Sequence, residues 1–337
     1  MTTLWIGGTS GLTRTYINQF GSDDLVLLGL ESSANAIQCD LTEMTKDEPK
    51  AIFDEAQQKN NKPVNKIVIG VRPSLLTPTF RDSTPMKMLQ GIEMILAHAC
   101  REENIDFVLH ISSVAAADHL RNQVFISEKV ADPPLPEYTA PYDVFKRASE
   151  EVISKVCQQN SVRYTHLRIS GIFSDNDKCL QCNVFRLQAL LTPFVPTPID
   201  HNSSLNVSRA IRSLLSVNHS SEMLQTMYYY TRPLALAEPV PYGYYVHEYK
   251  RAQNMQLLVW GPLIALTWAR ILLHLIANAF PFVPYIEALD YMFQVSYYEH
   301  SFDCSRFAKD FPNMLNEEES IYDCFTRRRK LMEISSS

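Results

Sequence analysis

Short runs of apolar residues alternate with longer amphipathic segments over the first two thirds of the chain. The apolar runs are expected as strands at Leu4–Ile6, Leu25–Leu28, Lys66–Ile69, Asp106–Ile111 and Tyr164–Ile169. The segments between them have helical length and spacing, at Leu12–Phe20, Pro49–Gln58, Thr84–Glu102 and Tyr142–Gln158. Apolar strands alternating with helices are typical of a parallel sheet covered on both faces. The pattern therefore predicts an α/β fold with a doubly wound parallel sheet.

The alternation weakens from about Gly171 onward, and prolines recur in clusters there. We therefore expect a sheet domain at residues 1–175 and a smaller substrate-binding region at residues 176–337. A chain of 337 residues is long enough for either one large domain or two such parts.

Composition narrows the class of protein. The net charge of −6 argues against a general nucleic-acid binder, because phosphate contacts need a basic surface. Seven scattered cysteines favour a reducing compartment, and the N-terminal residues lack the pattern of a signal peptide. Cys179 and Cys182 form a Cys-x-x-Cys without a second pair or a suitably spaced histidine, so no metal site is predicted.

A glycine-rich stretch, Gly7-Gly8-Thr9-Ser10-Gly11-Leu12, follows the first expected strand and opens the first expected helix. Glycines allow a tight turn there and let the backbone approach a pyrophosphate at the positive helix N-terminus. We expect Gly7, Ser10, Gly11 and Leu12 to bind a dinucleotide in a Rossmann-like fold. A third glycine, expected three residues after Gly11 for close helix–strand packing, is replaced by Arg14.

Glu31 indicates which dinucleotide is bound. It lies just past the second expected strand, 20 residues beyond Gly11, where an acidic residue holds the ribose hydroxyls of NAD. No arginine or lysine follows this strand closely to receive a 2′-phosphate. The sequence therefore favours NAD, with NADP as the alternative.

Three polar side chains in order along the chain suggest a proton-transfer site. Ser112 and Ser113 end an apolar strand, at the edge where open α/β sheets bind ligands. Tyr142 and Lys146 are four residues apart and share one face of a helix. A neighbouring ammonium favours the phenolate of a tyrosine, and a serine hydroxyl can hold a substrate oxygen. The set therefore predicts acid–base chemistry at an alcohol or a carbonyl.

Several stretches together resemble the extended short-chain dehydrogenases, in particular the group of 3β-hydroxysteroid and sterol-4α-carboxylate 3-dehydrogenases. They are Gly7–Gly11, Cys39–Leu41, His110–Val114, Tyr142–Lys146 with Glu150, Leu167–Phe173, Phe280–Pro284 and Tyr298–Ser305. The resemblance implies a hydride transfer between NAD(P) and a 3β-hydroxyl or 3-keto group of a steroid or sterol-like lipid. It also implies that Asp40 and Leu41 line the adenine pocket.

The same resemblance implies a role for each residue of the proton-transfer set. Tyr142 would be the acid/base, Lys146 would activate it and bind the cofactor ribose, and Ser113, rather than Ser112, would contact the substrate oxygen. The alternative is a catalytically idle relative that binds a dinucleotide and acts in regulation or interaction. The presence of all three residues, Ser113, Tyr142 and Lys146, favours the enzyme.

The segment Leu257–Phe280 is the one long apolar stretch of the chain. Arg270, His274 and Asn278 form a polar stripe on it at helical spacing, which favours a helix lying in a membrane interface over one crossing the bilayer. A helix packed on the protein core is the alternative. Together with the resemblance, such a helix implies a hydrophobic small-molecule substrate. It also implies peripheral association with the cytosolic face of an intracellular membrane, with the endoplasmic reticulum as the first choice. A cytoplasmic location is the second choice, and a homodimer remains open.

Overall fold

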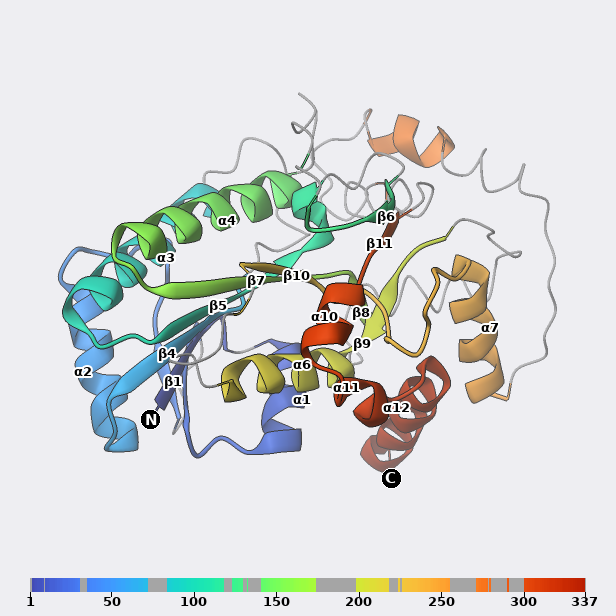
Figure 1. The fold of residues 1–337 in the computed structure, drawn as a ribbon, viewed down its shortest axis with the longest axis horizontal. Coiled ribbons are helices and arrows are strands. Elements are labelled where there is room, and N and C mark those ends of the chain that lie inside the picture. Colours follow the sequence, from blue (N-terminus) through green and yellow to red (C-terminus); the bar gives the residue numbers. More distant parts are fainter. Residues whose placement is uncertain are drawn as a thin grey trace.

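Parallel strands form the centre of the molecule (Figure 1). The computed structural model describes residues 2–8, 10–30, 35–71, 84–117, 123–129, 132, 141–173, 198–217, 224, 226–254, 271–277, 279, 290 and 300–336. The sheet has seven strands in the order β10-β7-β5-β4-β1-β2-β3. Their bounds are β1 Thr2–Ile6, β2 Leu25–Gly29, β3 Ala36–Gln38, β4 Val64–Ile69, β5 Phe107–Ser113, β7 Arg163–Ile169 and β10 Met227–Tyr229. All neighbouring strands pair in parallel, so the expected doubly wound, Rossmann-like sheet is confirmed.

All five expected strands are present, and β3 and β10 are added at the two edges. The four expected helices are also present, each within two residues of its predicted ends. They are α1 Gly11–Phe20, α2 Glu48–Asn60, α3 Thr84–Glu102 and α4 Pro141–Gln159. A further helix, α6 Ser204–Ser216, packs beside α1. The chain beyond residue 175 therefore contributes β10 to the sheet and α6 to one of its covering layers.

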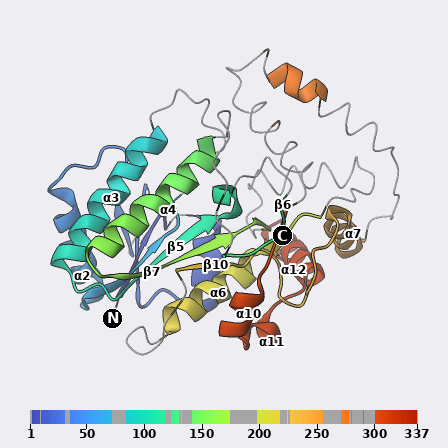
Figure 2. The ribbon, with the colours of Figure 1, turned by 45° about the horizontal axis from the view of Figure 1, so that its top comes forward.

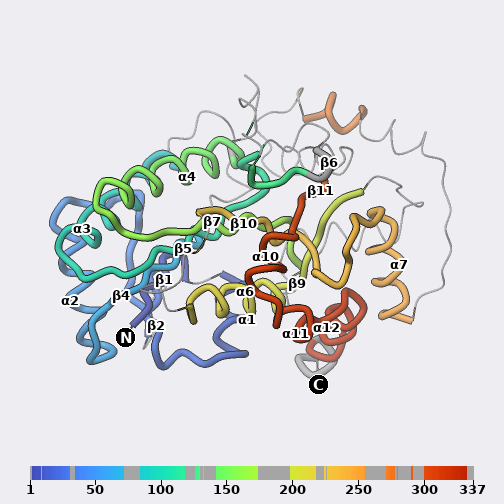
Figure 3. Tube along the Cα trace, viewed as in Figure 1, coloured from blue at the N-terminus to red at the C-terminus, as the bar shows by residue number. Residues whose placement is uncertain are grey.

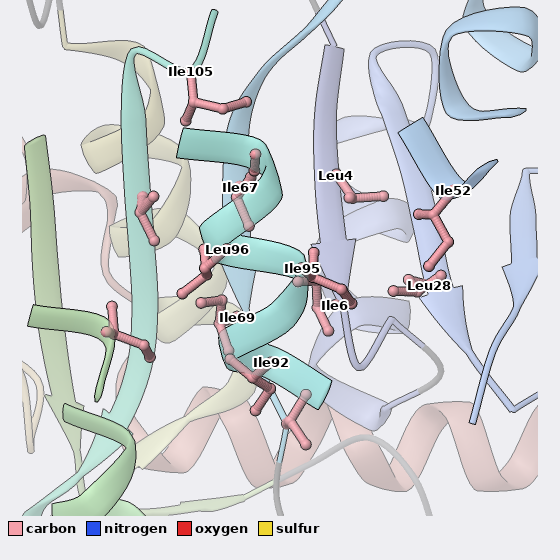
Figure 4. Packing of buried hydrophobic residues seen from close by; sticks show 14 of the residues in the cluster. Leu4, Ile6, Leu28, Ile52, Ile67, Ile69, Ile92, Ile95, Leu96 and Ile105 are labelled. Carbon is pink, nitrogen blue, oxygen red and sulfur yellow. The ribbon is translucent and has the colours of Figure 1, made fainter. Parts of the chain in front are cut away.

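The two faces of the sheet are buried by different helices. On one face, α2, α3 and α4 cover the strands, and α3 and α4 lie side by side (Figure 2). Ile92, Ile95 and Leu96 of α3 point toward β1 and β4, and each is 0 % exposed (Figure 4). On the other face, α1 and α6 meet side chains such as Leu109 and Leu167. Burial on both faces explains the apolar runs Leu4–Ile6 in β1 and Ile67–Ile69 in β4.

Two small sheets and four of the described C-terminal helices lie near the carboxyl edge of the main sheet (Figure 3). The sheets pair β6 Gln123–Ile126 with β11 His300–Phe302 and β8 Gly171–Phe173 with β9 His201–Ser203. The helices are α7 Tyr242–Ala252, α10 Ser305–Asp310, α11 Met314–Glu317 and α12 Ile321–Ser336. The helices α7 and α12 pack together, with the ring centroids of Tyr249 and Phe325 5.2 Å apart.

Asn206 of α6 fixes the chain just before α12. Its Nδ2 donates to the carbonyl oxygen of Glu319 at 3.0 Å, and its Oδ1 accepts from the N–H of Glu319 at 2.9 Å. The amide thus satisfies both backbone groups of one residue, 113 positions away in the sequence. The C-terminal helix is in this way attached to the helix layer of the main sheet.

Part of the long apolar segment lies within the described residues. Residues 271–277 are helical, and Leu272 and Leu275 are each 60 % exposed. His274 contacts Asp290, with 2.9 Å between Nδ1 and Oδ2. The other two residues of the expected polar stripe, Arg270 and Asn278, lie outside the described residues. Among the helices that the structure describes, none is both long and apolar enough to cross a membrane.

Candidate functional site

The glycine turn after β1 packs tightly against its neighbours. Gly7 has a φ of +84°, a conformation that favours glycine, and a Cβ there would lie 3.0 Å from the backbone of Gly70 and Val71. A Cβ on Gly8 would lie 2.7 Å from the Cβ of Leu27. Side chains at these two positions would therefore push the turn away from the ends of β4 and β2.

Ser10 begins the helix that follows the turn. Its Oγ accepts a hydrogen bond from the N–H of Thr13 at 3.2 Å and so caps α1. The N–H groups of Gly11 and Leu12 lie in the first turn, where a helix supplies no partner of its own. Together with the helix dipole they form a cradle suited to a pyrophosphate. Of the residues expected to bind a dinucleotide, Gly7, Ser10, Gly11 and Leu12 therefore lie together at this helix end.

Arg14, which replaces the third glycine, is exposed. The next residue, Thr15, packs α1 against the helix α6, where its Oγ1 donates to the Oγ of Ser204 at 3.2 Å. Because Arg14 is exposed, its side chain does not enter the space between α1 and the strands, and a glycine is not needed there.

The segment after β3 holds two residues expected near the adenine. Asp40 is exposed, and its Oδ1 accepts from the N–H and the Oγ1 of Thr42 at 2.9 and 2.7 Å. These hydrogen bonds lower the pKa of Asp40. Leu41 lies against α3, where a Cβ on Gly91 would overlap the carbonyl oxygen of Leu41. Gly91 is thus a residue of this region that sequence reasoning missed, and Glu31 lies outside the described residues.

The two serines at the end of β5 have different surroundings. The Oγ of Ser112 donates to Oε1 of Glu150 at 2.5 Å, so this hydroxyl is held by α4. The Oγ of Ser113 accepts from the N–H of Ala115 at 3.1 Å, at the start of the 3-10 helix Val114–Ala117. Ser112 is therefore committed to a structural hydrogen bond, whereas Ser113 lies at the carboxyl edge of the sheet.

Lys146 and Tyr142 lie on the same face of α4, as expected. The Nζ of Lys146 is 5.9 Å from the ring centroid of Tyr142. The same Nζ donates to the carbonyl oxygens of Val71 and Ile111, at 3.1 Å each, and the lysine is only 3 % exposed. The ammonium thus bridges two places in the chain. They are Val71, just after β4, and Ile111 in β5, directly before Ser112 and Ser113.

A buried charged network beside these residues was not predicted. Arg168 of β7 is 1 % exposed and binds the carboxylates of Glu150 and Asp132, together with the hydroxyl of Tyr229. One signal was present in the sequence, since an arginine within an apolar strand needs a buried partner. Glu150 lies two turns after Tyr142 in the sequence, but nothing in the sequence connected it to Arg168.

Two buried histidines adjoin this network. His110 and His166 are partners across β5 and β7, with their Nδ1 atoms 3.1 Å apart, and Nε2 of His166 is 2.8 Å from the Oγ of Ser154. Burial lowers the pKa of His166 to about 4, against the opposing charge of Glu150, and burial also lowers the pKa of His110. Both rings are therefore neutral at pH 7.

A surface cavity of about 390 Å³ lies away from this site. It is lined by the acidic side chains Glu128, Asp303 and Asp310 and by Lys129, Arg306 and Lys309, with two serines. Neither the glycine turn nor the serine–tyrosine–lysine set contributes to it. Within the described residues, no three metal-binding side chains cluster, and Cys179 and Cys182 lie outside them.

The sheet order, the glycine turn and the helices on both faces define a Rossmann-like α/β fold. Residues 86–186 match the model of the NAD dependent epimerase/dehydratase family. This segment includes β5, α4 and the three residues of the proton-transfer set. No curated protein sequence matches the chain.

Solved structures with the same fold agree with this family match. An L-threonine dehydrogenase from Phytophthora infestans is 15% identical, with a TM-score of 0.65, and 100% of this chain and 99% of that chain are covered. The Bordetella bronchiseptica enzyme WbmH in complex with NAD+ is 12% identical, with a TM-score of 0.61 and 96% of each chain covered. A human epimerase family protein with NADPH is 11% identical, with a TM-score of 0.63 and 99% of each covered.

These findings support the predicted resemblance at the level of the extended short-chain dehydrogenases. They also agree with a nicotinamide dinucleotide as the cofactor, since the family description names NAD and two of the three structures contain NAD+ or NADPH. The narrower resemblance to the 3β-hydroxysteroid dehydrogenase group finds no counterpart in these names.

Proposed function

We propose that the protein is a nicotinamide-dependent oxidoreductase that uses Ser113, Tyr142 and Lys146 at the carboxyl edge of its sheet. The observation that carries the proposal concerns Val71. The backbone of Val71 packs against Gly7 of the glycine turn, and its carbonyl oxygen accepts from Nζ of Lys146 at 3.1 Å. Val71 thus contacts the glycine turn through its backbone nitrogen and Lys146 through its carbonyl oxygen.

The residues present fit a dinucleotide. Gly7 and Gly8 leave the space that a backbone needs to approach phosphate, and the N-terminus of α1 at Gly11 and Leu12 would bind the pyrophosphate. Lys146 would hold the ribose next to the nicotinamide, with Glu31, Asp40 and Leu41 toward the adenosine. When bound, the nicotinamide supplies the acceptor or the donor of a hydride. NAD is favoured over NADP because an acidic residue follows β2.

Each residue of the set has a separate task. Tyr142, as the phenolate, accepts the proton of the substrate hydroxyl during oxidation and returns it during reduction. The ammonium of Lys146, fixed by the carbonyls of Val71 and Ile111, favours that phenolate electrostatically. The hydroxyl of Ser113 holds the substrate oxygen. This division of roles is the one that the resemblance implies.

We propose a 3β-hydroxyl or 3-keto group of a steroid or sterol-like lipid as the substrate. The proposal rests on the resemblance of the segments around Tyr142–Lys146, Leu167–Phe173 and Tyr298–Ser305 to that group of enzymes. The exposed Leu272 and Leu275 support contact with an apolar phase, in which such a substrate resides. Peripheral attachment to the cytosolic face of an intracellular membrane, first the endoplasmic reticulum, is part of the same proposal.

The test is NADH formation by the purified protein, followed by absorbance at pH 7–9. The panel contains 3β-hydroxysteroids, 4-carboxysterols, L-threonine and UDP-sugars. Reduction of NAD with a 3β-hydroxysteroid or a carboxysterol is expected. Turnover with threonine or a sugar nucleotide alone would refute the proposal of a lipid substrate. It would still agree with the proposal that the protein is an oxidoreductase. Tight NADH binding with no turnover in any case would favour the idle, dinucleotide-binding relative.

A further inference from the structure

The neighbouring strands β5 and β7 present polar side chains to α4 at paired positions. In the register of β5 and β7, His110 lies opposite His166 and Ser112 lies opposite Arg168. Side chains two apart on a strand share a face, so these four point to one side of the sheet. The hydroxyl of Ser112 and the guanidinium of Arg168 both bind Glu150 of α4, which shows that this is the side covered by α4.

The guanidinium of Arg168 has no unused donor. Nε and Nη2 donate to the two oxygens of Glu150 at 2.9 and 2.6 Å. Nη1 and Nη2 donate to the two oxygens of Asp132 at 2.7 and 2.5 Å, and Nη1 also donates to the hydroxyl of Tyr229 at 2.8 Å. A guanidinium carries five N–H groups, and all five are used. Two bidentate pairs fix both the position and the plane of the group.

The charge state of the network is set by these contacts. Burial alone would raise the pKa of Glu150, but the hydrogen bonds and charge of Arg168 bring it below its ordinary value. The pKa of Arg168 is raised, because the hydrogen bonds of Glu150 and Asp132 outweigh its burial. A buried ion pair is a weak source of stability, since desolvation offsets most of the attraction. Its clear effect is to fix geometry.

The network touches each element that carries a residue of the proposed site. Glu150 lies one turn after Lys146 on α4, and Ser112 directly precedes Ser113 on β5. Asp132 belongs to the segment that leads into α4. We propose that Arg168 and Glu150 are positioning residues that hold α4 against the end of β5, so that Ser113, Tyr142 and Lys146 keep their mutual geometry. This inference rests on the proposed function of those three residues.

The decisive measurement does not require a known substrate. The phenol of Tyr142 is titrated by ultraviolet absorbance, as the difference between a protein and the same protein carrying Tyr142→Phe. The ammonium of Lys146 is fixed by carbonyl oxygens at the ends of β4 and β5, whereas Tyr142 moves with α4. If Arg168 and Glu150 hold α4 in place there, Arg168→Lys should raise the pKa of this phenol by about one unit, because the distance between the phenol and the ammonium increases. Lys146→Ala is the positive control and should raise it at least as much.

Arg232→Lys is the matched control. Arg232 is 3 % exposed and also binds a carboxylate, that of Asp200 at 2.8 Å, together with the carbonyl oxygens of Phe302 and Leu236. Arg232→Lys should lower the melting temperature of the protein but leave the titration of Tyr142 unchanged. Equal shifts in both variants would mean a general loss of structure and would overturn the inference. If Arg168→Lys does not fold, Glu150→Gln and Ser112→Ala are measured in the same way.

Kinetics with an accepted substrate provide the second readout. A displacement of about 1 Å at the reacting groups costs roughly 100-fold in rate, so kcat of Arg168→Lys should fall 10- to 100-fold while KM and the NADH dissociation constant change less than twofold. A melting-temperature change with an unchanged phenol titration and kcat would refute the positioning role. An absence of turnover in the wild type would contradict the proposed function alone, because the titration still decides the inference.

Discussion

The ammonium of Lys146 has few ways to move, because two carbonyl oxygens from different strand ends hold it. Sequence spacing predicted that Tyr142 and Lys146 share a helix face, and the structure places them so. Spacing could not predict the carbonyl partners, since those depend on how the ends of β4 and β5 approach α4. The same holds for Ser112, whose hydrogen bond to Glu150 becomes visible only when the strand and the helix meet.

At Tyr142, we expect Tyr142→Phe to lower turnover by about 10²- to 10⁴-fold, because only the proton-transferring oxygen is removed. NADH affinity should stay nearly unchanged, since the proposed cofactor contacts lie on the glycine turn and Lys146. Steady-state rates and NADH fluorescence titration check the two parts separately. A variant that keeps most of the wild-type rate would refute the acid/base role.

His166 gives a prediction about pH. Its folded-state pKa is about 4, below the value of about 6.5 expected when the chain is unfolded. A depressed pKa stabilises the fold above pH 6.5, and this stability is lost as the pH falls toward 4. From pH 7 to pH 5 the free energy of unfolding should fall by about 2 kcal/mol through this residue. Urea titrations of the wild type and His166→Gln at both pH values isolate the contribution, and identical losses in the two proteins would contradict it.

At the scale of elements, the helices and strands of the first 170 residues follow from local pattern. Amphipathic spacing and apolar runs are local properties, and α3 was predicted with both of its ends as observed. The edge strand β3 is only three residues long, too short to give a period. How closely two elements approach is also not a local property, and Gly91 is the clearest case, since it permits α3 to lie against the backbone of Leu41.

Gly91→Ala tests this close approach. In a free helix the change would stabilise by about 1 kcal/mol through helix propensity. Here the new Cβ overlaps a backbone carbonyl, so we expect a net destabilisation of about 1–3 kcal/mol. NADH affinity should fall as well, because Leu41 is expected at the adenine. Ala51→Gly, at an exposed position of α2, measures the propensity term alone. A more stable Gly91→Ala protein with full NADH affinity would rule out the tight contact.

At the scale of the whole molecule, the sequence was least informative about the return of the C-terminal part to the sheet. The pattern predicted a smaller substrate-binding region at residues 176–337, and it gave no sign that β10 and α6 of this part lie in the layers of the main sheet. The fixation of Glu319 by Asn206 joins positions 113 residues apart. Such long-range pairings depend on the complete fold and leave no periodic signal in the chain.

The apolar segment gives a prediction at this scale. Replacing Leu272 and Leu275 by glutamate should abolish binding to anionic phospholipid vesicles, because both side chains are exposed and would contribute the apolar contact. The melting temperature should stay within a few degrees, since no core is disturbed. Leu331→Glu, at another exposed leucine, is the matched control and should still bind. A wild-type protein that fails to float with vesicles would refute the membrane association.

The position of β1 in the sheet bears on how the protein emerges from the ribosome. Of the seven strands of the sheet, β1 is made before the others and lies in the interior; β2 and β3 extend the sheet on one side, and β4, β5, β7 and β10 extend it on the other in the order of synthesis. Every new strand therefore finds an existing edge and never has to insert between two paired neighbours. The sheet can grow while the chain is still being translated, and the two strands left at its borders, β3 and β10, are only three residues long. Short edge strands offer few unpaired backbone groups to other nascent chains, which limits aggregation during synthesis.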